Sequence, residues 1–78
     1  GLVESLPASL IGDWVIGGTT YTADASTRFE QEHGSFAVGT CVEIEYLPAS
    51  NQALKIESEH SYKCDGSSGG SGESYKSE

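Results

Sequence analysis

The chain has few basic residues. Only Arg28, Lys55, Lys63 and Lys76 are basic, against twelve acidic side chains, and the formal net charge is −8. Phosphate contacts dominate the affinity of proteins for nucleic acids, and the same cationic side chains attract proteins to anionic membranes. The shortage of positive charge therefore argues against nucleic-acid binding and against adhesion to a membrane surface.

Long apolar runs are also missing. No stretch approaches the roughly 18 apolar residues of a membrane span, so we expect no membrane insertion. The first residues lack the charged and then apolar pattern of a secretory signal, so the signal of a secreted protein would lie outside this sequence. The 78 residues suffice for one small domain. The apolar fraction is modest, at 36%, and methionine is absent. A hydrophobic core of the size that this allows is only marginally stable unless a cross-link stabilises it.

A period-two alternation of apolar and polar residues predicts a long β-hairpin. It runs through 38–47 and again through 53–60, and the connection between them has turn chemistry. The predicted register pairs Tyr46 with Leu54, Ile44 with Ile56, and Glu45 with Lys55. In this register the apolar side chains share one face, and the Glu45–Lys55 pair is a favourable cross-strand contact.

The chain before this hairpin predicts further short strands, at 2–6, 13–16, 19–22 and 27–30. Gly17 and Gly18 suit a two-residue turn in which both residues have positive φ. A helix over 25–32 is the alternative to the strand at 27–30. Short strands divided by glycine and proline predict an all-β domain over 1–64, a small barrel or sandwich of five to six strands.

The last residues, 65–78, have a different composition. Residues 65–72 contain no apolar side chain, and glycine and serine dominate them. Such a segment cannot offset the entropy of ordering. We therefore expect a flexible, disordered C-terminal tail or interdomain linker here, outside the folded domain.

The order of these motifs resembles the bacterial DUF5666 domains. The resemblance covers residues 2–59 and is carried by three motifs: Gly-Asp-Trp-Val-Ile-Gly-Gly at 12–18, Val-Gly-Thr-Cys-Val-Glu-Ile-Glu at 38–45, and Lys-Ile-Glu at 55–57. It implies a small β-rich unit, OB-like in strand pattern, of a secreted or envelope protein and often beside other domains. The family name records an unknown function, so the resemblance implies no catalytic residue.

Cys41 and Cys64 are the two cysteines of the chain. Two cysteines of a small exported protein usually pair, and a disulfide would supply the missing staple. The alternative is two unpaired thiols, with Cys41 on a strand face and Cys64 near the tail. Redox catalysis requires an electropositive site that lowers the thiol pKa. Because this chain is acidic, we do not expect a redox-active cysteine.

The pattern Glu-x-Glu-His occurs twice, ending at His33 and at His60. Carboxylate and imidazole ligands suit zinc and other transition metals. However, adjacent residues of one strand point to opposite faces, so Glu59 and His60 cannot both approach one ion from their strand. We therefore expect neither a metal nor another cofactor.

An acidic strip is predicted on the outer face of the hairpin, formed by Glu43, Glu45, Glu57 and Glu59 and relieved only by Lys55. Paired carboxylates can hydrolyse sugars, but only in a cleft that raises the pKa of one of them. The strip instead suits a solvated face that opposes aggregation. With Tyr62 as an exposed aromatic, these four residues form the predicted binding surface.

These observations predict a non-catalytic accessory or binding module of an exported bacterial protein. We expect a monomer that contacts a neighbouring domain, another protein or a glycan, and no catalytic residues. The alternative is a metal-dependent or hydrolytic enzyme that uses the surface carboxylates and the histidines.

Overall fold

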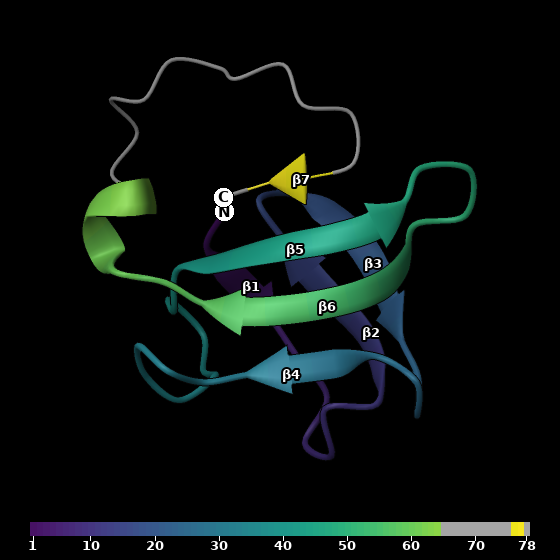
Figure 1. Ribbon diagram of the computed structural model, residues 1–78, viewed down its shortest axis with the longest axis horizontal. Coiled ribbons are helices and arrows are strands. Elements are labelled where there is room, and N and C mark those ends of the chain that lie inside the picture. The colour runs from purple at the N-terminus through teal and green to yellow at the C-terminus, as the bar shows by residue number, and fades with distance from the viewer. Residues whose placement is uncertain (65–75, 78) are drawn as a thin grey trace.

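The computed structural model describes residues 1–64 and 76–77, which form strands and one short helix (Figure 1). The strands are β1 (Val3–Ser5), β2 (Gly12–Ile16), β3 (Thr19–Ala23), β4 (Arg28–Glu30), β5 (Val42–Leu47), β6 (Gln52–Ser58) and β7 (Lys76–Ser77). The helix is a single 3-10 turn, η1 (Ser61–Cys64). The all-β prediction is confirmed, and the segment that could have been a helix, 25–32, contains β4 instead.

All seven strands belong to one mixed sheet. The strand order is β1-β2-β3-β6-β5-β7, and β4 pairs with β6 beside this path. The sheet curls until β1 reaches the beginning of β5, where Leu2 and Cys41 form an isolated bridge and the Val3 amide donates to the Thr40 carbonyl at 3.0 Å. Further backbone hydrogen bonds join Val3 to Gly39 and Gly1 to Val42, but β1 and β5 do not pair as strands, so the predicted barrel is not closed.

The β2–β3 hairpin follows the predicted register. Gly17 and Gly18 have φ of 58° and 84°, the positive values that a two-residue turn of this kind requires. Trp14 consequently lies opposite Tyr21, and Ile16 lies opposite Thr19.

The β5–β6 hairpin follows the predicted register over most of its length. Ile44 pairs with Ile56 and Glu45 with Lys55, as predicted. The predicted pair of Tyr46 with Leu54 is wrong, because the register shifts after Glu45 and Tyr46 lies opposite Ala53. A β-bulge of this kind leaves one residue without a partner, and Leu54 is accordingly 44% exposed.

The core lies on the inner face of the curled sheet. Its buried members are Val3, Trp14, Ile16, Tyr21, Ala23, Val42, Ile44, Ala53 and Ile56. Trp14 is fully buried, and its indole Nε1 donates to the Leu10 carbonyl at 2.9 Å. Its ring contacts that of Phe36 edge-on, with 5.2 Å between ring centroids, and stacks on that of Phe29, with 6.0 Å between centroids. The small core is therefore centred on one aromatic cluster.

The first strand of the hairpin, predicted over 38–47, begins only at Val42, and the segment before it, 36–40, is not a strand. Thr40 Oγ1 accepts a hydrogen bond from the Ala37 amide at 3.0 Å and donates one to the Ser35 carbonyl at 2.9 Å. Such local bonds between side chain and backbone compete with a sheet ladder. The segment is consequently a loop, from which Phe36 packs on the core while Val38 is exposed.

The predicted tail, 65–78, falls mostly outside the described residues. The structure differs from the expectation at Lys76–Ser77, where β7 pairs antiparallel with Ile44 and Glu45 of β5. An edge strand offers unpaired backbone groups to any extended segment. Pairing of this kind depends on the backbone, so apolar composition does not predict it.

Thr27 joins the loop before β4 to β6. Its buried Oγ1 accepts from the Asp24 amide at 2.9 Å and donates to the Ala53 carbonyl at 2.8 Å. We expect Thr27→Val to lower the free energy of unfolding by about 1–3 kcal/mol, because it leaves the buried Ala53 carbonyl and the part-buried Asp24 amide without this partner. Urea denaturation measures the loss, with Thr20→Val on the exposed side of β3 as the matched control. Equal effects of both changes would contradict this role.

Candidate functional site

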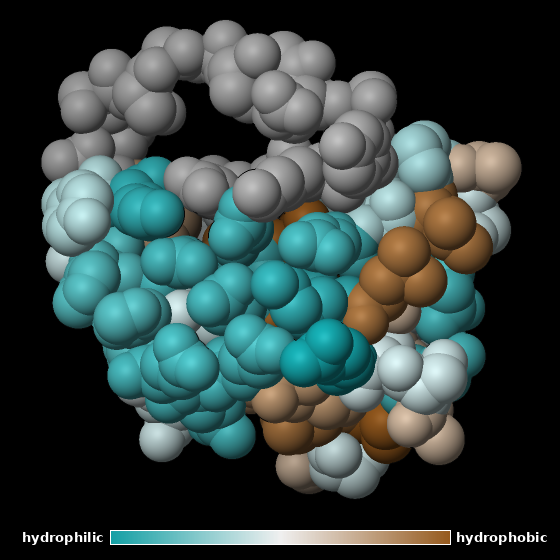
Figure 2. Space-filling model, in the orientation of Figure 1, coloured by the Kyte–Doolittle hydropathy of each residue, from teal (hydrophilic) through white to brown (hydrophobic). Residues whose placement is uncertain are grey.

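The outer face of β4, β6 and β5 carries most of the charge of the sheet. In parallel register Arg28 lies beside Lys55 and Glu30 beside Glu57, and on the other side Glu43 lies opposite Glu57. Figure 2 shows this face as an almost continuous hydrophilic surface, with hydrophobic residues gathered at its right and lower margins. We call it the charged face; its members are Arg28, Glu30, Glu43, Glu45, Lys55, Glu57 and Glu59.

Lys55 lies at the centre of the charged face. Its Nζ is 3.4 Å from a carboxylate oxygen of Glu57 and 3.5 Å from one of Glu45. Burial lowers the pKa of Lys55, but the hydrogen bond with Glu57 and the charges of Glu45, Glu57 and Glu30 outweigh it, so the pKa is raised overall. Lys55 therefore keeps its charge and holds carboxylates of β5 and β6 together.

Three carboxylates converge beside it. One oxygen from each of Glu43, Glu57 and Glu59 lies within 4.8 Å of the others. The sequence placed them correctly on one face, but the expectation of an open, solvated strip relieved only by Lys55 is wrong: Glu43 is 6% exposed and Glu59 is 9% exposed. The more exposed carboxylates of the predicted binding surface are Glu45 and Glu57.

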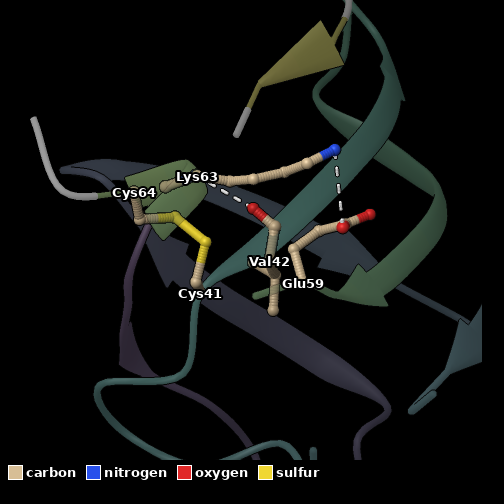
Figure 3. Close-up of a disulfide and its surroundings, with 6 residues drawn as sticks. Cys41, Val42, Glu59, Lys63 and Cys64 are labelled. Atoms are coloured by element: carbon tan, nitrogen blue, oxygen red, sulfur yellow. Dashed lines mark hydrogen bonds and ion pairs between the residues drawn. A yellow bond between two sulfur atoms is a disulfide. The ribbon is translucent and has the colours of Figure 1, made fainter. Parts of the chain in front are cut away.

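The disulfide places η1 beside this end of the face. Cys41 and Cys64 are bonded, with 5.8 Å between their Cα atoms, so the predicted pairing is confirmed. The bond folds η1 back over the end of the β5–β6 hairpin, and Lys63 reaches down to Glu59, with 3.7 Å between Nζ and the carboxylate oxygen (Figure 3). Lys63 therefore pairs with the acidic strip as well as Lys55, although the sequence did not predict this pair.

Tyr62 lies at the outer end of an aromatic stack. It is 66% exposed, and its predicted exposure is confirmed. Its ring stacks on that of His60, with 5.6 Å between centroids and an interplanar angle of 11°. The His60 ring in turn contacts that of His33, with 4.0 Å between centroids and an angle of 46°. Three side chains from two separate segments therefore form one exposed stack.

The contact between the two histidines was missed by the sequence reasoning, which considered each Glu-x-Glu-His pattern within its own strand. The parallel pairing of β4 with β6 aligns the two patterns, since Glu30 lies beside Glu57. Three residues further along each segment, His33 reaches His60. The signal that could have found the contact was the repeat itself, read as two neighbouring strands in parallel register.

A family model described as Domain of unknown function (DUF5666) matches residues 1–57. The chain belongs to the DUF5666 family. No curated protein and no solved structure matches it. The family match covers every strand from β1 to β5 and nearly all of β6, but not η1, Cys64 or Tyr62. Among the described residues, no helix is long and apolar enough to span a membrane.

Proposed function

We propose that this DUF5666 domain is a non-catalytic binding module of an exported bacterial protein, and that its charged face binds a protein segment rich in lysine and arginine. The observation that carries the proposal is the composition of that face, where Glu45 and Glu57 flank a single central lysine. Residues 1–64 hold nine acidic and three basic side chains, a net charge of −6. Such an imbalance speeds the approach of a basic partner.

The support for an extracytoplasmic location is the Cys41–Cys64 disulfide, because disulfides persist in oxidising compartments. The support for a non-catalytic role is the arrangement of the strip. Its carboxylates lie along paired strands of one sheet face, where Lys55 and Lys63 pair with three of them. The competing candidate is a metal-dependent or hydrolytic enzyme. In such an enzyme the carboxylates would surround a bound substrate instead of lying along one sheet face.

The same charges argue against an oligonucleotide as the partner. Small OB-like barrels that bind single strands use a basic groove interleaved with aromatic side chains. Each basic side chain of residues 1–64 lies within 4.0 Å of a carboxylate: Arg28 of Glu30, Lys55 of Glu45 and Glu57, and Lys63 of Glu59. A phosphate would have to displace these carboxylates and approach a face of its own sign.

An NMR titration tests the proposal with three defined probes: a short peptide rich in lysine and arginine, a single-stranded oligonucleotide, and a chitin-derived oligosaccharide. We expect the peptide to shift amide signals of β4, β5 and β6, with an affinity that falls as salt is added. The oligonucleotide should cause no shift at physiological salt. Shifts around Tyr62 with the oligosaccharide, and none with the peptide, would replace the basic partner by a glycan.

Matched variants separate the charged face from net charge. Glu45→Gln with Glu57→Gln removes two charges from the face, and Glu4→Gln with Asp13→Asn removes two from exposed positions of β1 and β2. We expect the first pair to weaken peptide binding about fivefold more than the second, the equivalent of roughly 1 kcal/mol. Equal weakening would show that only net charge acts, and would contradict the assignment of the face.

A further inference from the structure

The two histidines belong to segments that the fold holds firmly side by side. The His33 amide donates to Ser58 Oγ at 3.0 Å, and Ser58 is fully buried at the end of β6. His60 is fixed from both sides: the Glu59 amide donates to the Cys41 carbonyl at 2.8 Å, and the Lys63 amide donates to the His60 carbonyl at 3.0 Å. The backbone positions of both imidazoles are therefore set before any ligand arrives.

From this arrangement we infer that His33 and His60 form a binding site for a divalent transition-metal ion, with Zn²⁺ and Cu²⁺ as the fitting class. Neutral imidazole is a preferred ligand of both ions. Both side chains are exposed at the rim of the sheet, so water completes the coordination. The site is separate from the charged face and does not depend on the proposed partner.

The two rings lie slightly closer together than two imidazoles that bind one ion. An imidazole nitrogen lies about 2.0–2.1 Å from zinc, so two rings on one ion have centroids roughly 4.5–5.2 Å apart. The observed separation is 4.0 Å, and the rings are tilted by 46° rather than parallel. Binding would therefore require side-chain rotations that move the two rings slightly apart and turn one nitrogen of each toward the ion.

The surroundings favour a cation. The net charge of −6 over residues 1–64 attracts positive ions to the surface. Tyr62 stacks on the His60 ring, which restricts the positions of that ring and reduces the entropy lost on binding. The three converging carboxylates are a different cluster, because among the described residues the groups whose ligand atoms lie within 4.8 Å of one another include neither histidine.

Calorimetric titration with Zn²⁺ tests the site on the whole chain. We expect one ion per chain, and we expect His33→Ala and His60→Ala each to weaken binding at least about tenfold, because two linked ligands bind far better than either alone. Glu57→Gln is the control and should change the affinity less than about twofold. Binding that survives either histidine change, or that is lost in Glu57→Gln, would overturn the inference, as would the absence of saturable binding.

A second measurement uses the unmodified protein, so that it does not depend on the folding of a variant. Cu²⁺ added well below one equivalent should broaden the imidazole signals of His33 and His60 together, before it broadens the signals of other side chains. Broadening of one histidine alone, or of glutamate signals first, would contradict the two-histidine site.

Discussion

Trp14→Ala is expected to lower the free energy of unfolding by about 3–5 kcal/mol, the usual cost of removing a fully buried large aromatic side chain. The indole is fully buried and contacts both Phe29 and Phe36. The change also leaves the Leu10 carbonyl without the indole donor. Small domains are stabilised by roughly 5–15 kcal/mol, so the loss is a large share of the total.

Denaturation in urea measures this loss, and Leu54→Ala is the matched control. Leu54 is a large apolar residue that the β-bulge leaves 44% exposed, so its truncation should cost less than about 1 kcal/mol. If Trp14→Ala prevents folding altogether, Ile56→Val measures the same core in a folded protein, with an expected loss of about 0.5–1.5 kcal/mol. A cost below 1 kcal/mol for Trp14→Ala would contradict a core centred on this residue.

The parts of the fold that follow from local chemistry could be predicted from the sequence. Alternation fixed the faces of β5 and β6, and the two glycines fixed the register of β2 against β3. The bulge at Leu54 could not be predicted in this way. It depends on the tight turn after Leu47, whose carbonyl accepts from the Asn51 amide at 2.7 Å with Asn51 at φ 57°.

The candidate site shows the same division. Alternation placed the four glutamates on one face, but it could not show that Glu43 and Glu59 are nearly buried. The contact of Glu59 with Lys63 depends on η1 folding back, and the Cys41–Cys64 disulfide joins η1 to the start of the hairpin. The contact of His33 with His60 depends on the parallel pairing of β4 with β6, a long-range feature that no pattern within one strand reports.

The Cys41–Cys64 disulfide is expected to contribute roughly 3 kcal/mol to stability, because it closes a loop with a sequence separation of 23 and so restricts the unfolded chain. In a domain of this size each kcal/mol shifts the melting temperature by about 4–8 °C. Dithiothreitol should therefore lower the melting temperature by more than about 10 °C. Circular dichroism during heating, with and without the reductant, measures the shift.

A variant without the disulfide separates this effect from other actions of the reductant. Cys41→Ser with Cys64→Ser should melt near the temperature of the reduced protein and should not respond to dithiothreitol. The same bond holds η1 over the sheet, so its loss should also release Lys63 from Glu59 and increase the exposure of that carboxylate. An unchanged melting temperature on reduction, or two titratable thiols in the air-exposed folded protein, would show that the bond is not the staple of this small core.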